Sequence, residues 1–348
     1  PTRGFALGAL IALLPGLGGC QYLFPTPIDQ HSATDNPSQA VRAIGATYVE
    51  GEEITVALSL DGVSAGRGVL RVGKKCLADG KLVIPVFAEG GSSGFLSVFA
   101  TAEAETFGLI DLDNNSALES RWDVLVGEKR SLLESDYHPG GYRFHQLREE
   151  PEKKPKHVRR KVELPTEQVP HDGHSLLGYL RRWQPEPGTR GHVFANVGRS
   201  LYRAELLFVG PDSILTGDGS VAVTRIDGTA SRINERTLKP KGRGGRPFSL
   251  WSANDEGRTP WRLIVETDVV KIALDVEKRT VVAVPDGPPE PCASRVDKTE
   301  LARAKARRKA DKPAPPAPSE ADPKQLQQLP PKFRLKVFQR KLQESDDD

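Results

Sequence analysis

The sequence predicts a mainly β protein, either an antiparallel sandwich or an open barrel, with one short covering helix and disordered ends. Short runs of alternating apolar and polar residues recur along the chain, as where Ile54, Val56 and Leu58 alternate with Thr55 and Ala57. Asp-Gly dipeptides, which are typical of hairpin turns, lie among these runs. Glycine and proline together make up 61 of the 348 residues (33 Gly and 28 Pro), above their average combined share of about 12%. Such a high share excludes a long-helix protein.

The predicted strands lie in one β-rich domain at 46–285. The alternation places them at 54–60, 68–72, 82–88, 95–101, 122–126, 142–147, 158–164, 192–196, 201–209, 220–226, 248–253, 261–267, 269–274 and 280–284. Hairpin turns are expected at Asp61-Gly62, Asp79-Gly80 and Asp227-Gly228. So many short strands with turn residues between them favour an antiparallel sandwich or barrel.

The segment 172–183 interrupts the strands with a helical pattern. Asp172 or Ser175 is expected to cap its start, and Arg181 and Arg182 suit the negative end of its dipole. Four apolar residues follow helical spacing, namely Leu176, Leu177, Leu180 and Trp183. A single helix between two sets of strands is expected to cover the sheet.

The first 20 residues have the layout of a lipoprotein signal peptide. Arg3 precedes an apolar run at 5–14, which is too short to span a membrane, and Leu17-Gly18-Gly19 leads to Cys20. This ending resembles the bacterial lipobox, which implies cleavage after residue 19 and acylation of Cys20. Three acyl chains would make an effectively permanent membrane anchor. The alternatives are an ordinary signal peptide with a coincidental cysteine, or a buried apolar helix.

The residue after Cys20 bears on location. It is Gln21 rather than Asp, which by resemblance to bacterial sorting rules favours the outer membrane, with the domain facing the periplasm. The segment 20–45 has three prolines and no periodic pattern, so we expect a tether. The other cysteines, Cys76 and Cys292, would then lie in an oxidising compartment. A bridge between them would be worth about 4–5 kcal/mol on the chain-entropy model, and two free thiols are the alternative.

Three segments together resemble the bacterial domain-of-unknown-function 3108 family, over roughly residues 46–285. They are Leu60-Asp61-Gly62-Val63-Ser64-Ala65-Gly66, the helix from His171 to Arg181, and Leu250-Trp251-Ser252-Ala253-Asn254-Asp255-Glu256-Gly257-Arg258-Thr259-Pro260. The resemblance implies an exported or lipid-anchored, mostly β protein with no established activity, and it supplies no catalytic residues. The basic stretch at 153–161 and the long C-terminal tail depart from the family pattern.

Two sets of residues are candidates for ligand contact. A strand, turn and strand are expected at 251–260, where Trp251, Asp255 and Arg258 form a candidate polar or sugar-binding rim. The alternative there is a turn with a surface ion pair worth less than about 1 kcal/mol. A basic, glycine-rich loop offers candidate anion contacts for lipid headgroups or lipopolysaccharide phosphates, namely Lys239, Lys241, Arg243 and Arg246. An exposed flexible loop is the alternative.

The sequence predicts neither a metal site nor a cofactor. His171, Asp172 and His174 include zinc-type ligands, but zinc usually needs a third and a fourth ligand, so helix-entry capping is the favoured interpretation. Asp111-Leu112-Asp113-Asn114-Asn115 starts like a calcium loop, yet Ser116 and Trp122 stand where that loop needs Gly and Glu. No nucleophile motif, Walker sequence or zinc-protease motif is present.

The composition changes after residue 285. The tail at 286–348 contains a basic stretch, a polyproline-like spacer at 313–318 and a basic amphipathic pattern at 332–342. Such a helix can lie on an anionic membrane or dock a partner, and a solvated tail is the alternative. The chain carries 49 basic and 46 acidic residues, and the balance of +3 gives no case for nucleic-acid binding.

These features predict a non-enzymatic periplasmic binding or scaffold domain for a lipid, a glycan or an envelope protein. One alternative is an envelope hydrolase of polysaccharide or peptidoglycan that uses carboxylates from Asp111, Asp113, Asp255 or Glu256. The other is an outer-membrane assembly component that acts by protein contact.

Overall fold

The computed structural model describes residues 39–40, 48–93, 101–165, 169–216, 219–241, 244–255, 257–267, 269–284 and 287–292. Outside the described residues lie the predicted signal peptide, Cys20, most of the predicted tether, residues 95–100 of the strand predicted at 95–101, Arg243, Glu256 and the tail from residue 293 onward, with its 332–342 pattern. None of the helices in the described ranges has the length and apolar character that a membrane span requires.

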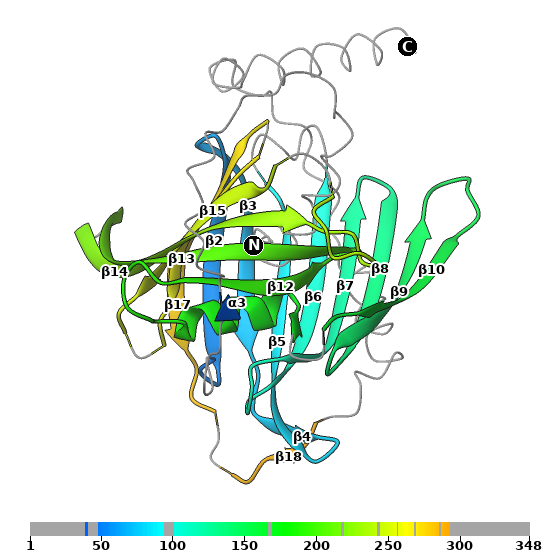
Figure 1. The fold of residues 1–348 in the computed structure, drawn as a ribbon, viewed down its shortest axis with the longest axis horizontal. Coiled ribbons are helices and arrows are strands. Elements are labelled where there is room, and N and C mark those ends of the chain that lie inside the picture. The colour runs from blue at the N-terminus through cyan, green and yellow to red at the C-terminus, as the bar shows by residue number, and fades with distance from the viewer. Residues whose placement is uncertain are drawn as a thin grey trace, which may run out of the picture.

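The fold is one large, curled, mainly antiparallel sheet, as the sequence predicted (Figure 1). Its strands are β1 (Gln39–Ala40), β2 (Glu52–Leu60), β3 (Val63–Val72), β4 (Cys76–Ala78), β5 (Lys81–Ser92), β6 (Ala102–Asp111), β7 (Ala117–Val126), β8 (Lys129–His138), β9 (Gly141–Glu149), β10 (Lys156–Glu163), β11 (Pro170–His171), β12 (Arg190–Val197), β13 (Ser200–Thr216), β14 (Gly219–Arg232), β15 (Arg246–Ala253), β16 (Pro260–Glu266), β17 (Lys271–Val281) and β18 (Glu290–Pro291).

Hydrogen-bonded neighbours run from β12 through β13, β14, β15, β16 and β17 to β2, then through β3, β5, β6, β7, β8 and β9 to β10. The short strands β1 and β11 lie parallel to β12, and β4 and β18 extend the sheet beside β5. Among the described strands no ladder joins β10 to β12, so the sheet is an open barrel.

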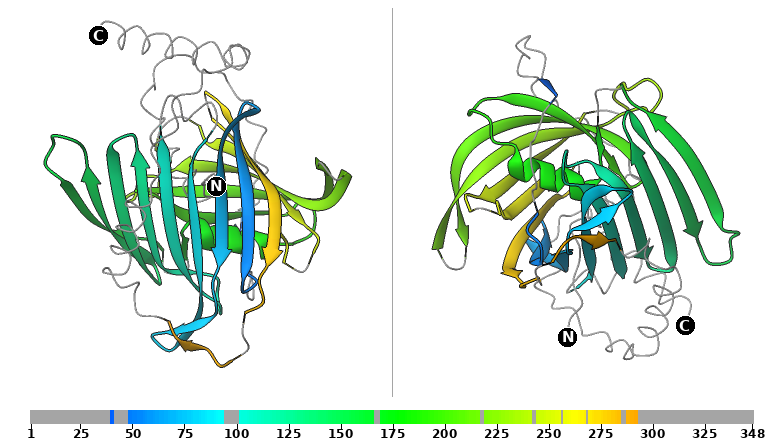
Figure 2. Two further views of the ribbon diagram at one scale, coloured as in Figure 1. Left: turned by 180° about the vertical axis from the view of Figure 1, so that it is seen from behind. Right: turned by 90° about the horizontal axis from the view of Figure 1, so that it is seen from below.

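The helix α3 (Gly173–Arg182) lies inside the curl of the sheet (Figure 2). Asp172 is its N-cap, accepting from the Ser175 backbone N–H at 2.7 Å, while the Ser175 hydroxyl accepts from the Asp172 N–H at 3.0 Å. This capping box satisfies two backbone donors at the helix start. The apolar face that the sequence predicted packs into the main core, where Trp183 meets Phe208 edge-to-face.

The two ends of the sheet pack against each other through a second, smaller core. It joins the β7–β10 part of the sheet to β12 and β13 through Trp122, Leu133, Tyr137, Tyr142, Phe144, Val162, Phe194, Val197 and Leu201. Side-chain packing therefore holds together the two ends that hydrogen bonds do not join.

The predicted turns are confirmed at two of three positions. Asp61-Gly62 and Asp79-Gly80 have positive φ at both residues, as a type I′ hairpin requires, and join β2 to β3 and β4 to β5. The prediction for Asp227-Gly228 was wrong, because both residues lie inside β14 and pair with β13 and β15. Gly228 is needed for close packing instead, since a Cβ there would lie 2.4 Å from the Phe248 ring.

Several strand boundaries also differ from the prediction. The strand β8 was not predicted, because its outward residues are mostly polar or charged and its buried face includes Ser135. Likewise β6 alternates alanine with glutamate and threonine, which weakens its apolar pattern. The separate strands predicted at 269–274 and 280–284 are the single strand β17, which a bulge between Val276 and Lys278 interrupts.

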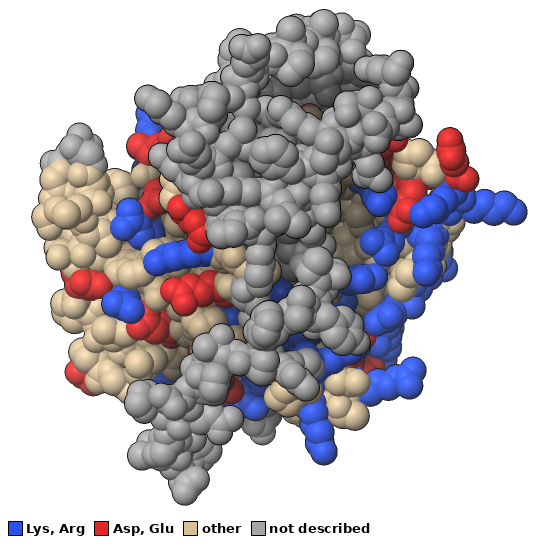
Figure 3. Space-filling view, turned by 90° about the horizontal axis from the view of Figure 1, so that it is seen from above, with Lys and Arg blue, Asp and Glu red and all other residues tan. Residues whose placement is uncertain are grey.

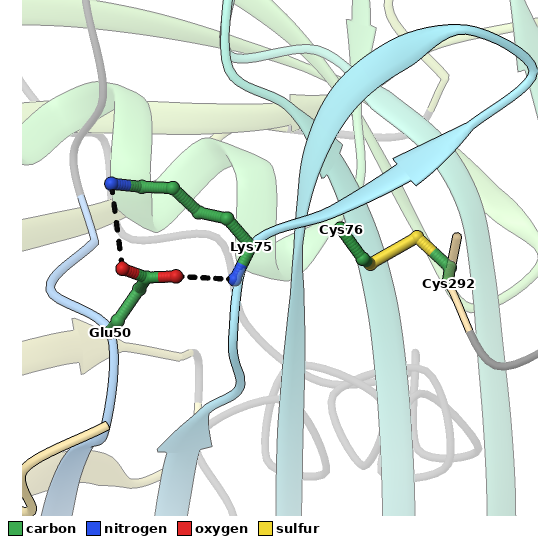
Figure 4. The surroundings of a disulfide bond; sticks show 4 residues. All are labelled: Glu50, Lys75, Cys76 and Cys292. Atoms are coloured by element: carbon green, nitrogen blue, oxygen red, sulfur yellow. Dashed lines mark hydrogen bonds and ion pairs between the residues drawn. A yellow bond between two sulfur atoms is a disulfide. The ribbon is translucent and has the colours of Figure 1, made fainter. Parts of the chain in front are cut away.

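Cys76 and Cys292 form a disulfide, one of the two states that the sequence left open (Figure 4). Their Cα atoms are 4.8 Å apart, and β18 pairs in parallel with β4 beside the bond. Next to it, the Lys75 backbone N–H donates to Glu50 Oε1 at 2.5 Å, and Lys75 Nζ lies 3.6 Å from the other oxygen of that carboxylate. The bond fixes the end of the described domain to its first hairpins.

Candidate functional site

A groove of about 420 Å³ lies on the outer face of the sheet, across β13, β14, β15 and β16. Strand alternation shows that it faces outward, because Leu206 and Ile226 are buried in the core while their strand neighbours point the other way. Charged and apolar side chains both line it, including Arg190, Glu205, Leu207, Asp227, Ile264 and Glu266.

The polar groups in the groove are held in place by one another. Arg225 donates from Nε and Nη2 to the two carboxylate oxygens of Asp227, at 2.8 and 2.9 Å. The Ser249 hydroxyl donates to the same carboxylate at 2.7 Å. Hydrogen bonding between charged partners raises the pKa of Arg225, with the bond to Asp227 as the largest cause. A bidentate pair of this kind presents its remaining donors and lone pairs in fixed directions.

An aromatic side chain flanks the groove. The guanidinium of Arg225 lies 5.2 Å from the centre of the Trp251 ring, and the indole N–H donates to Asp212 Oδ2 at 2.9 Å. That hydrogen bond is the largest cause that lowers the pKa of Asp212. The half-buried Trp251 is therefore fixed from both sides and places an apolar ring surface next to hydrogen-bonding groups.

The three residues predicted as a ligand rim lie in two places in the structure. Trp251 lies beside the groove, whereas Asp255 lies in the turn after β15, where it accepts from the Thr259 hydroxyl at 2.9 Å and pairs with Arg279 at 3.6 Å. The backbone N–H of Arg258 donates to the Asp255 carbonyl at 3.1 Å. The strand, turn and strand predicted at 251–260 are thus present, and the rim itself stays a prediction.

The candidate anion residues lie at the other end of β14. Lys239 and Lys241 are exposed in the loop after this strand, and the Lys241 backbone N–H donates to the Arg232 carbonyl at 2.7 Å. Arg246 begins β15 and pairs in register with Ala230. This loop therefore lies beside Arg232, and its end at Arg246 adjoins Pro247, which lines the groove.

The zinc-type residues serve the start of α3. Asp172 is the N-cap, His171 Nδ1 lies 3.3 Å from the Ser175 hydroxyl, and His174 Nε2 lies 2.9 Å from the Thr106 hydroxyl. Among the described residues no group of three or more histidine, cysteine or acidic side chains is arranged to hold a metal. Asp172 thus caps the helix, His171 contacts the capping serine, and His174 contacts β6.

The calcium-like segment forms a turn braced by its own polar groups. Asp111 accepts from Lys81 Nζ and from the Asp113 backbone N–H, both at 2.9 Å, and the Asn114 side chain accepts from the Ser116 N–H. Asn115 has a φ of 54°, a conformation that asparagine tolerates well. Loop geometry thus accounts for this run of residues.

The two buried histidines predict a pH-dependent stability. Burial lowers the pKa of His171 from 6.5 to about 4, and it lowers that of His174 as well. Below pH 6.5 the unfolded chain takes up protons that the folded chain does not, so stability falls with falling pH until about pH 4. At about 1.4 kcal/mol for each pH unit, His171 alone contributes a loss of about 3 kcal/mol.

Urea unfolding of the full chain at several pH values between 7 and 4 measures this loss. The His171→Gln variant should have a flatter pH dependence than the wild type, even if it is less stable at pH 7. Equal slopes for the two proteins would contradict the assignment. The comparison variant is His157→Gln, at an exposed histidine that lies beside His145.

The groove itself was missed by the sequence reasoning, for an identifiable reason. Asp227 was expected at a hairpin turn, and Arg225 appeared only as a polar residue within a strand. An alternating polar face on β14 was the available signal, since Arg225, Asp227 and Thr229 recur with period two beside a buried Ile226. That pattern says which face is outward, but the groove depends on strands that are brought together by folding.

No protein-family model matches this sequence, and no curated protein matches it. Solved structures similar to the chain include a β-barrel-like protein of domain of unknown function DUF1849 from Brucella abortus, with TM-score 0.41, 9% identity, and coverage of 70% of this chain and 100% of that one.

Another is a Bacteroides fragilis protein described as exported, with a YmcC-like fold, at TM-score 0.27 and 9% identity, covering 68% of this chain and 99% of that one. The third is the Mycobacterium tuberculosis lipoprotein LppX, at TM-score 0.26 and 14% identity, covering 67% and 89%. TM-scores this low carry no argument about function, and the resemblance to the domain-of-unknown-function 3108 family stays a prediction.

Proposed function

We propose that this chain is an exported, lipid-anchored binding protein of the bacterial envelope, and that its outer-face groove binds a glycan. The observation that carries the proposal is the composition of the groove, where oriented charges of both signs lie beside apolar side chains and an aromatic ring. A sugar presents hydroxyl groups that both donate and accept, together with apolar C–H faces, so it matches such a lining.

The charge balance of the groove favours a neutral polyhydroxylated ligand. Arg190 and Arg225 supply two positive charges, while Glu205, Asp227 and Glu266 supply three negative ones. Because neither sign dominates strongly, a polyanion gains little there. A lipid chain would need an apolar cavity, and the inside of the curl is packed with α3 and the main core.

The location in the envelope rests on the chemistry of the cysteines. A disulfide between Cys76 and Cys292 persists in an oxidising compartment such as the periplasm, which agrees with the lipobox that ends at Cys20. Anchoring at the outer membrane follows from Gln21 by the sorting rule alone, and radiolabelled palmitate incorporation that depends on Cys20 tests the acylation.

One observation favours the hydrolase alternative: three carboxylates, those of Glu205, Asp227 and Glu266, line the same groove. These are not the carboxylates that the sequence suggested. Asp111 is engaged with Lys81, and Asp255 is engaged with Thr259 and Arg279. Asp227 already accepts from Arg225 and Ser249, which suits an orienting group. An assay for newly released reducing ends, run beside each binding measurement, distinguishes cleavage from binding.

The binding test uses an array of immobilised neutral hexose, N-acetylhexosamine and uronic acid oligosaccharides, followed by calorimetry on the tightest class. We expect the Asp227→Asn variant to bind at least about tenfold more weakly, since a hydrogen bond to a charged group contributes about 1.5–3 kcal/mol. Trp251→Ala should weaken binding as well, because it removes the ring that fixes Arg225.

Asp123→Asn is the matched control for this test. Arg130 donates to both oxygens of Asp123 at 2.8 and 2.7 Å, the same arrangement as the Arg225–Asp227 pair, but far along the sheet on β7 and β8. The control should bind like the wild type. The proposal fails if no oligosaccharide class binds, or if the two aspartate variants lose affinity equally.

A further inference from the structure

Four arginines gather where the two ends of the open sheet meet. Arg148 lies in β9, Arg160 in β10, Arg199 in the turn between β12 and β13, and Arg232 at the end of β14. We call these four residues the arginine cluster. They come from segments that the second core brings together, since that core joins β9 and β10 to β12, β13 and the residue after Arg232, Ile233.

The side chains of Arg148 and Arg160 are directed toward β12–β14 by strand alternation. Arg160 pairs in register with Phe144, which is buried in the second core, and Arg148 lies four residues along β9 on the same face as Phe144. Arg160 Nη1 also lies 3.1 Å from a carboxylate oxygen of Glu235, in the loop after β14. That ion pair places β10 directly beside this loop.

The charges in the cluster oppose one another. The pKa of Arg199 is lowered, first by burial and then by repulsion from Arg148, Arg232 and Arg160. Like charges at close range destabilise a folded chain. The repulsion on Arg199 does not stabilise the fold, and a bound anion would relieve it.

Other cations widen the positive surface around the cluster. Lys156 pairs in register with Arg148, and the exposed Lys239 and Lys241 lie in the loop beside Arg232. Lysine and arginine side chains gather over the β9 and β10 end of the molecule (Figure 3). Glu235 offsets the charge of Arg160, so Arg148, Arg199 and Arg232 supply the excess positive charge of the cluster, and Glu150 pairs with Lys153.

We propose that the arginine cluster binds a phosphate group on a ligand that is distinct from the one in the outer-face groove. Guanidinium groups suit a phosphate because each can donate two parallel hydrogen bonds to its oxygens, and they are less strongly hydrated than lysine. Segments from both ends of the sheet contribute to the site, so the site exists only in the folded domain. The phosphate can come from a lipid headgroup or from a soluble phosphate compound.

The test uses the full chain with Cys20→Ser, so that no acyl anchor attaches the protein to vesicles. Two probes are compared at about 0.1 M salt: inorganic pyrophosphate in solution, and phosphatidylcholine vesicles with or without phosphatidylglycerol. The test variant is the double substitution Arg199→Gln with Arg232→Gln. The matched control, Arg143→Gln with Arg159→Gln, removes the same charge from the opposite face of the β9–β10 hairpin.

We expect the wild type to bind at least one probe, and the test variant to bind it at least tenfold more weakly than the control does. Binding to phosphatidylglycerol vesicles alone identifies a headgroup, and binding to pyrophosphate alone identifies a soluble ligand. Equal losses in the two variants would mean general charge attraction and would overturn the proposal. Failure of the wild type to bind either probe would overturn it too.

A second measurement separates a lost site from a misfolded one. Because Arg199 is repelled by its neighbours, Arg199→Gln should have a melting temperature equal to or above that of the wild type. A lower melting temperature would show that Arg199 stabilises the fold and would count against a binding role.

Discussion

Replacing Glu52 by glutamine is expected to lower the free energy of unfolding by about 3–5 kcal/mol, one of the two largest effects predicted for this chain. The Glu52 carboxylate is fully buried and accepts from both terminal nitrogens of Arg181 at 2.9 Å and from Arg279 Nε at 2.8 Å. The variant would leave the Arg181 guanidinium, which is only 1% exposed, without a compensating charge.

This network joins four parts of the fold. Arg181 comes from α3, Glu52 from β2 and Arg279 from β17, and Arg181 Nε also donates to the Gly257 carbonyl at 2.9 Å. The Arg181 guanidinium lies 5.1 Å from the centre of the Tyr48 ring. Burial raises the pKa of Tyr48, so the phenol stays neutral beside these charges. Loss of the Glu52 charge therefore weakens the attachment of α3 to β2 and β17.

The control for this prediction is Glu277→Gln. Glu277 pairs with Arg67 at 2.9 Å, with side chains 33% and 54% exposed, so its removal should cost less than about 1 kcal/mol. Urea unfolding of the full chain, with the slope of the transition compared between variants, measures both effects. A Glu52→Gln variant as stable as the Glu277→Gln variant would show that the buried pair is dispensable.

How far the sequence could predict this fold is seen well at Arg181. Helical spacing placed 172–183 correctly, and the Asp172 cap followed from local chemistry, because both depend on residues within a few positions of one another. Arg181 was expected to interact with the helix dipole, but it turns inward to Glu52, 129 residues away. No local pattern indicates such a partner.

The same division holds for the strands and the candidate sites. Asp61-Gly62 forms its turn because the turn conformation is set by the φ and ψ angles of these two residues alone. Asp227-Gly228 instead lies in a strand because β13 and β15 pair with it on either side. The groove and the arginine cluster are built from strands distant in sequence. Period-two alternation indicates which face of a strand is buried, but it does not say which strands become neighbours.

Removing the disulfide is the other change expected to have a large effect. With both Cys76 and Cys292 replaced by serine, the free energy of unfolding should fall by about 2–5 kcal/mol. The residues are 216 positions apart, so the bond closes a loop that contains nearly all of the described domain. In the chain-entropy model such a loop strongly restricts the unfolded ensemble, and removing the bond restores that freedom.

Chemical denaturation of the oxidised wild type, the reduced wild type and the double serine variant measures this effect. Reduction should lower the stability of the wild type to that of the variant, and the reductant should leave the variant unchanged. Because β18 also holds to β4 through hydrogen bonds such as Cys292 N–H to the Leu77 carbonyl at 2.9 Å, the folded structures should differ little. An unchanged midpoint after reduction would mean that the unfolded chain is already compact enough for the bond to add no restriction, and the expected loss would be wrong.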